Sequence, residues 1–113
     1  MVDVPRERFE ELVADALDGI PTELGSYMEN VAVFVQDVPP QSNLLGLYQG
    51  VPLTARGISY SGTMPDRITI YRRPICAMSP TEEDVVTEVR RVVIHEVAHH
   101  FGIDDPRLRE LGW

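Results

Sequence analysis

The sequence predicts a single α+β domain, in which a short mixed sheet is flanked by an N-terminal helix and a long C-terminal helix. Two segments, residues 5–18 and 79–101, carry apolar residues at the spacing of an amphipathic helix. Between them, residues 30–36 and 66–73 are rich in β-branched side chains, which favour strands. The chain has 113 residues, near the usual size for one hydrophobic core, so we expect one domain over residues 1–113.

The first predicted helix spans residues 5–18. Pro5 suits the first helical position, and Gly19 with Pro21 should end the helix. The apolar stripe consists of Phe9, Leu12, Val13, Ala16, Leu17 and Ile20. Acidic side chains cover the opposite side, which we interpret as a solvated face rather than a binding surface. A short helical turn is expected at residues 22–27.

Three extended segments are predicted, at residues 30–36, 44–49 and 66–73. The first has apolar residues on both faces, so we expect it at the centre of the sheet. The third alternates apolar and polar residues and precedes Pro74, so we expect it at a sheet edge with one face open to solvent. Turn-forming residues predict loops at residues 37–43 and 59–65.

The last long helix is predicted to begin after Ser79 and to end near Phe101. Ser79, Pro80 and Glu82 fit the N-cap, first and third positions of a capping box. Its apolar stripe consists of Val85, Val86, Val89, Val92, Val93 and Val97. Because valine is a weak helix former, this helix should depend on burial for its stability.

The residues with the clearest chemical signal lie at the end of this helix. Residues 95–105 read His-Glu-Val-Ala-His-His-Phe-Gly-Ile-Asp-Asp and contain all three histidines of the chain. His95 and His99 are four residues apart, so on a helix they share one face and can bind one metal ion. Glu96 lies where a carboxylate can reach a water on that ion. This arrangement is the H-E-x-x-H pattern of zinc hydrolases.

A third ligand requires the chain to turn back. In an unbroken helix, Asp105 would lie about 15 Å along the axis from His95. Gly102 can adopt the left-handed conformation that ends a helix, and a turn there brings Asp105 toward the same ion. Two alternatives remain open: Asp104 as the third ligand, and Asp105 as the N-cap of a last helix over residues 106–111.

The pattern H-E-x-x-H-x-x-G-x-x-D in residues 95–105 resembles the extended motif of the metzincins, with Asp where most of them have His. The chain also resembles the minimal zincin-like metallopeptidase family of short bacterial proteins. Residues 44–57 and 66–75 and the C-terminal Leu-Gly-Trp113 carry that resemblance. It implies a compact zincin-type domain with a metal ion on the last long helix. No Met follows His95 to form a Met-turn, so Trp113 or Met78 are candidates for the apolar floor beneath the ion.

The expected cofactor is one Zn²⁺ ion, because two imidazoles and one carboxylate leave a fourth position for water. Such an ion lowers the pKa of its bound water, and Glu96 would accept the proton. The predicted function is therefore a zinc-dependent metallopeptidase-like hydrolase acting on a peptide or protein. One alternative is a metal-binding protein of the same fold without proteolytic activity. A metal-dependent ribonuclease is a weaker alternative, because the related RNA-processing enzymes have H-x-x-x-H-x5-H.

Other side chains are candidates for assisting this reaction. In zincins the strand that precedes the motif helix holds the substrate, and residues 68–71 occupy that place. Tyr71 or Tyr48 could stabilise an oxyanion, and Arg72 or Arg73 could hold a carboxylate. The simpler interpretations are tyrosines at the edge of the core and arginines paired with surface acids.

His100 lies about 100° around the helix from His99, so it should point away from the ion. We expect it to pack or to donate a hydrogen bond, with a contact to a metal ligand as an alternative. Cys76 is the single cysteine, so no intramolecular disulfide can form, and we expect a small buried side chain there.

The composition narrows the choice of partners. The net charge is −8 and all ten basic residues are arginine, which argues against nucleic acid or anionic lipid as a partner. Residues 1–11 are charged and resemble no signal peptide, and no apolar run is long enough to span a membrane. We therefore expect a cytoplasmic protein.

Overall fold

The computed structural model describes residues 2–50, 65–110 and 112. Its elements, in chain order, are α1 (Arg6–Asp18), α2 (Thr22–Gly25), the 3-10 helix η1 (Ser26–Met28), β1 (Val31–Gln36), β2 (Gly46–Gln49), β3 (Asp66–Tyr71), α3 (Arg72–Met78), α4 (Glu82–His100) and α5 (Asp105–Glu110). The α+β class and the long C-terminal helix are confirmed. The loop predicted at residues 59–65 lies, except for Pro65, outside the described residues.

The strands form a mixed sheet in the order β1-β3-β2, in which β1 is parallel to β3 and β2 is antiparallel to it. The expected positions of β1 and β3 in the sheet were therefore wrong: β3 is central and β1 lies at an edge. Thr69 and Tyr71, which made β3 look half exposed, are buried together with its isoleucines. Phe34 of β1 is instead 44% exposed. Pro74 costs no sheet hydrogen bond, because it lies in α3.

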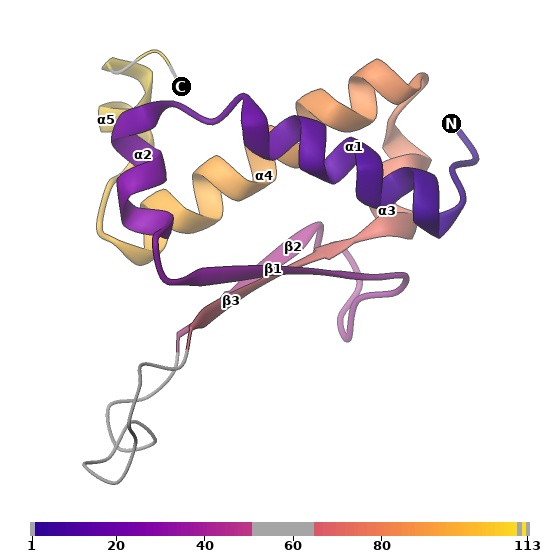
Figure 1. Cartoon of the computed structure of the whole chain (residues 1–113), viewed down its shortest axis with the longest axis horizontal. Coiled ribbons are helices and arrows are strands. Elements are labelled where there is room, and N and C mark those ends of the chain that lie inside the picture. The colour runs from indigo at the N-terminus through magenta and orange to yellow at the C-terminus, as the bar shows by residue number, and fades with distance from the viewer. Residues whose placement is uncertain (1, 51–64, 111, 113) are drawn as a thin grey trace, which may run out of the picture.

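The helices α1 and α4 lie on the same face of the sheet, and α1 packs along α4 (Figure 1). The core between these layers is built from α1, β3 and α4, and includes Phe9, Leu12, Ile68, Ile70, Val85, Val89, Val93 and Val97. The valine stripe of α4 is thus buried, as its weak helix propensity requires. None of the helices in the described part of the chain is long and apolar enough to cross a membrane.

The start of α4 differs from the expectation by two residues. Thr81 is the N-cap, and its Oγ1 accepts a hydrogen bond from the backbone N–H of Asp84 over 3.2 Å. Ser79 is buried and donates its hydroxyl to the carbonyl oxygen of Ile75 over 2.7 Å, so it closes α3 instead. Because Ser79 and Thr81 are both good caps, the sequence pattern alone did not distinguish them.

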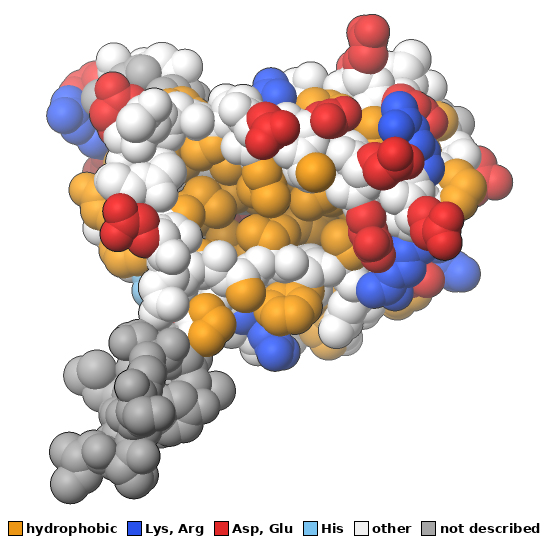
Figure 2. Space-filling view, in the orientation of Figure 1, with side chains coloured by type: hydrophobic (Ala, Val, Ile, Leu, Met, Phe, Trp, Pro, Cys, Tyr) orange, Lys and Arg blue, Asp and Glu red, His pale blue; other side chains and the backbone are white. Residues whose placement is uncertain are grey.

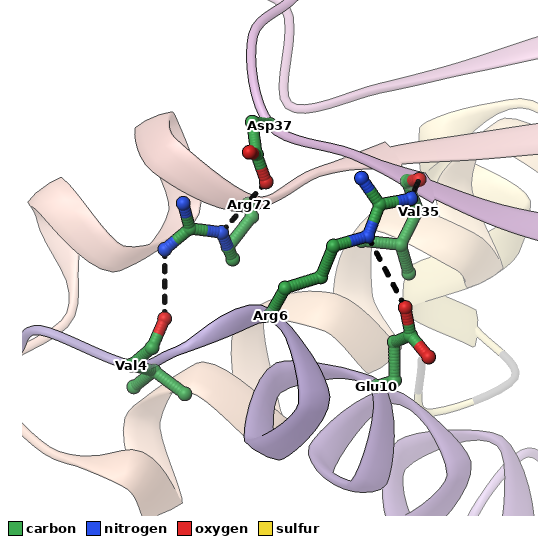
Figure 3. A network of polar contacts seen from close by, with 6 residues as sticks. All are labelled: Val4, Arg6, Glu10, Val35, Asp37 and Arg72. Atoms are coloured by element: carbon green, nitrogen blue, oxygen red, sulfur yellow. Dashed lines mark hydrogen bonds and ion pairs between the residues drawn. The ribbon is translucent and has the colours of Figure 1, made fainter.

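A polar network ties α1 to β1 and α3 (Figure 3). Nε of Arg72 donates to Oδ1 of Asp37 over 2.8 Å, and its Nη1 donates to the carbonyl oxygen of Val4 over 2.7 Å. Nη2 of Arg6 donates to the carbonyl oxygen of Val35, at the outer edge of β1. The hydrogen bond from Arg72, with its charge, lowers the pKa of the Asp37 carboxyl below its usual value.

Candidate metal centre

The end of α4 is shaped by a glycine, as the sequence predicts. The C-cap is Phe101, and Gly102 follows with φ at +80°. The backbone N–H of Ile103 donates to the carbonyl oxygen of Ala98 over 2.7 Å, and the backbone N–H of Gly102 donates to the carbonyl oxygen of His99 over 3.2 Å. This pair of bonds is the Schellman motif, which satisfies the last carbonyls of a helix and reverses the chain. The reversal leads directly into α5.

His95, His99 and Asp105 converge as a result. Oδ1 of Asp105 lies 2.9 Å from Nε2 of His99 and 3.4 Å from Nδ1 of His95. The three ligand atoms all lie within 4.8 Å of one another. Two imidazoles and one carboxylate are a donor set that zinc accepts, and in a tetrahedral site with ligands about 2.1 Å from the ion the ligand atoms stand about 3.4 Å apart. The three side chains are thus close enough to share one ion after small adjustments.

The convergence also affects charge and access. The hydrogen bond with His99, together with the charges of both histidines, lowers the pKa of the Asp105 carboxyl. The side chains of His99 and Asp105 are 51% and 55% exposed, so water reaches the cluster. That access suits an ion with a position open to water.

Asp104 has a different role from Asp105. Its Oδ1 accepts a hydrogen bond from the backbone N–H of Arg107 over 3.0 Å, and so caps the N-terminus of α5. The alternative that Asp105 is the N-cap is wrong, because Asp105 is the first residue of α5 and its carboxylate meets the histidines. The two neighbouring aspartates therefore have different roles: Asp104 caps α5, and Asp105 joins the two histidines.

Glu96 is held by the edge of the sheet. The backbone N–H of Tyr48 donates to Oε1 of Glu96 over 3.1 Å. The carbonyl oxygen of Leu45 accepts a hydrogen bond from the backbone N–H of Tyr71 in β3. Successive residues of a strand direct their backbone groups to opposite edges, so those of Tyr48, three residues later, face away from β3 and toward α4. The expectation that residues 68–71 form the edge beside the site was wrong, because β3 is paired on both sides and β2 takes that place.

A cleft of about 220 Å³ lies between α4 and the chain that leads into β2. It is lined by Asn43, Leu44, Leu45, Gly46, Arg91, Val92, His95 and Glu96. A Cβ atom on Gly46 would lie 2.5 Å from Cγ1 of Val92, so only glycine permits this approach of strand and helix. The cleft therefore lies beside His95 and the Glu96 carboxylate.

His100 points away from the metal-ligand candidates, as its place on the helix predicts. Its ring stacks on the ring of Tyr48, with centroids 3.9 Å apart. The hydroxyl of Tyr48 donates to Oδ2 of Asp66 over 2.7 Å, and Nε2 of His100 lies 4.0 Å from the same oxygen. These contacts fasten the end of β2 to the last turn of α4.

The other candidates do not join the cluster. Tyr71 is buried at the far end of β3, and Arg72 is bound to Asp37 and Val4 near the opposite end of the sheet (Figure 1). Met78 is exposed and precedes the start of α4, so it does not lie beneath the histidines. Trp113 lies outside the described residues, and Cys76 is buried, as expected.

Two residues of the cleft were missed by the sequence reasoning. Arg91 precedes His95 by four residues, and this helical spacing could have identified it. Asn43 belongs to a loop and adopts a φ of +75°, and no pattern in the sequence places it beside the motif.

Comparisons with known proteins agree with this architecture. The sequence model of a family described as zincin-like metallopeptidase matches residues 28–113. A solved structure titled conserved hypothetical protein, from Thermo thermophilus, is similar in fold with a TM-score of 0.53. It is 24% identical in sequence, and the match covers 86% of this chain and 94% of that one. Comparison with the curated proteins gives no match. The chain belongs to the zincin-like metallopeptidase family.

Proposed function

We propose that the protein is a zinc-dependent peptidase, with the ion bound by His95, His99 and Asp105. The observation that carries the proposal is the convergence of these three donors, within 4.8 Å of one another, at the end of one helix and the start of the next. The family to which the chain belongs supports a metal ion, usually zinc, at such a site.

Zinc bound there would supply a Lewis acid for the carbonyl group and the attacking water. Glu96 is the general base of the proposal. The hydrogen bond from Tyr48 fixes one carboxylate oxygen, and the carboxylate takes a proton from the water and passes it to the leaving amine nitrogen. The water oxygen bonds to the carbonyl carbon, the C–N bond breaks, and a carboxylate and an amine result.

The cleft between α4 and the chain that leads into β2 is the proposed binding place for the substrate. The sheet ends at β2 among the described strands, and the backbone of alternate residues in β2 faces α4. Because Tyr48 donates its N–H to Glu96 and Gly46 packs against Val92, α4 occupies this edge, and the substrate would enter the cleft rather than add a strand to the sheet. The cleft of about 220 Å³ would then receive one side chain or chain end of the substrate.

The first experiment measures zinc by mass spectrometry after titration of metal-free protein. We expect one tightly bound ion in the wild type, loss of binding in His99→Ala, and clearly weakened binding in Asp105→Ala, because each variant removes one of the proposed ligands. Asp104→Ala is the matched control, because it removes the neighbouring carboxylate that caps α5. Equal losses in the two aspartate variants, or no zinc in the wild type, would contradict the proposed site.

The second experiment measures cleavage of a fluorogenic peptide library by the zinc-loaded protein. We expect Glu96→Gln to bind zinc as the wild type does and to cleave about a hundredfold to ten-thousandfold more slowly. The small volume of the cleft favours one other outcome, a zinc site that binds a partner without hydrolysis. Zinc uptake with no cleavage of any peptide would select that function over the peptidase.

A further inference from the structure

A cation shares the helix face of the metal-ligand candidates. Arg91 lies one turn of α4 before His95, and both side chains line the cleft between α4 and β2. Among the described residues that line this cleft, Arg91 carries the positive charge and Glu96 the negative one. Arg91 is therefore the group that an anionic part of a ligand would meet beside the site.

A neighbouring carboxylate holds this arginine in place. Nη2 of Arg91 donates to Oε1 of Glu88, and this hydrogen bond raises the pKa of Arg91. The Glu88 side chain is only 15% exposed, whereas that of Arg91 is 52% exposed. A guanidinium has five N–H donors, so the contact with Glu88 orients the group while donors remain for a second carboxylate.

The rest of the cleft suits a carboxylate on a short aliphatic stem. Leu44, Leu45 and Val92 supply apolar lining, and Asn43 also lines the cleft and carries an amide. We infer that Arg91 determines specificity by binding a carboxylate of the substrate next to the peptide bond that is cleaved. This inference rests on the proposed peptidase function and adds the class of substrate to it.

Two parts of a peptide can present that carboxylate. One is the C-terminal carboxylate, which would make the protein a carboxypeptidase. The other is the side chain of an internal Asp or Glu, which would make it an endopeptidase with acidic preference. The chemistry that Arg91 recognises is the same in both cases, so the peptides chosen for the test must separate them.

The test measures peptide affinity by calorimetry with zinc-loaded Glu96→Gln protein, which binds substrate while cleaving it slowly. One pair of peptides, blocked at both ends, differs by Glu or Gln at one internal position. A second pair carries no acidic side chain and differs by a free or an amidated C-terminus. We expect the carboxylate member of one pair to bind about fivefold to tenfold more tightly at low salt, and Arg91→Gln to abolish the difference.

Two further variants sharpen the result. Arg91→Lys keeps the charge but not the planar fork, so an intermediate preference is expected. Arg73→Gln is the control, because Arg73 is an exposed arginine of α3 outside the cleft. Equal affinities within both pairs, or a preference that survives in Arg91→Gln, would overturn the inference.

The role of Arg91 and the peptidase function are contradicted by different results. Cleavage of neutral peptides without any carboxylate preference would leave the peptidase function intact and remove the role of Arg91. If the protein takes up no zinc, the proposed function falls, and titration of the same peptide pairs into the metal-free protein still tests Arg91.

Discussion

The backbone N–H of Tyr48 donates a hydrogen bond to Oε1 of Glu96 over 3.1 Å, which joins the edge of the sheet to the metal helix. The bond requires β2 to lie close to α4, and two features keep it there. Tyr48 is fastened to Asp66 and His100 through its side chain, and Gly46 leaves room for Val92. The geometry of the candidate general base is thus set by contacts outside the motif.

Gly46→Ala is expected to lower the free energy of unfolding by about 1–3 kcal/mol, because the added Cβ overlaps Cγ1 of Val92. Urea unfolding measures the change. Val92→Ala removes the clashing atom, so the double variant should lose less stability than the sum of the two single variants. Strict additivity would show that the close approach of β2 and α4 does not limit this position.

Gly102→Ala should destabilise the protein by about 1–2 kcal/mol and weaken zinc binding, because an L-residue at φ +80° is strained and the turn positions Asp105. Gly25→Ala is the matched control. Neither glycine has an atom within 4 Å of its built Cβ, but Gly25 has an ordinary helical φ of −56°. Equal effects of the two substitutions on unfolding and zinc affinity would refute the role of the left-handed turn.

The contact between Asp37 and Arg72 predicts a pH dependence of stability. The hydrogen bond from Arg72 lowers the pKa of Asp37 in the folded state, so the carboxylate stabilises the fold above the pKa it has when unfolded, about 3.9. That contribution is lost as the pH falls through the lower, folded value. Asp37→Asn should therefore destabilise the protein at pH 6 and lose its effect toward pH 2. A constant difference across this range in urea unfolding would disagree with the shifted pKa.

Cys76 should react slowly with a thiol reagent such as dithionitrobenzoate in the native state. The side chain is buried, and desolvation raises the pKa of its thiol, so little thiolate forms at pH 7. In denaturant the reaction should become fast. A native rate equal to the denatured rate would mean that the thiol is accessible. Cys76→Ala should leave zinc affinity unchanged, because the thiol lies outside the cluster of candidate ligands.

The sequence was sufficient for features that depend on local spacing. The four-residue interval between His95 and His99 and the left-handed turn at Gly102 both follow from helix geometry, and the structure contains both. The order of the strands was not accessible in this way. A strand pattern reports which faces are apolar, but not which neighbours pair with its edges, so β1 and β3 were exchanged.

Position-specific choices between similar residues were also beyond the sequence. Asp104 and Asp105 can both cap a helix, and the residue at which the turn after α4 ends decides which of them caps α5 and which meets the histidines. Tyr71 looked half-exposed because the alternation in β3 suggested one face open to solvent, whereas the structure buries it. Such choices are made by tertiary packing rather than by local propensity.

The contact between Arg6 and Val35 has a consequence for colloidal behaviour. No charged residue or proline interrupts β1 from Val31 to Gln36, and a strand of this kind at a sheet edge invites pairing with another molecule. A hollow of about 370 Å³, with apolar side chains in its wall and Arg6 and Glu10 also lining it, runs between this strand and α1 (Figure 2). Arg6 occupies a carbonyl of this outer edge, so we expect it to hinder such pairing. Arg6→Ala should therefore accelerate aggregation in light scattering while its fold, by circular dichroism, stays unchanged; the same aggregation rate as the wild type would deny Arg6 that protective role.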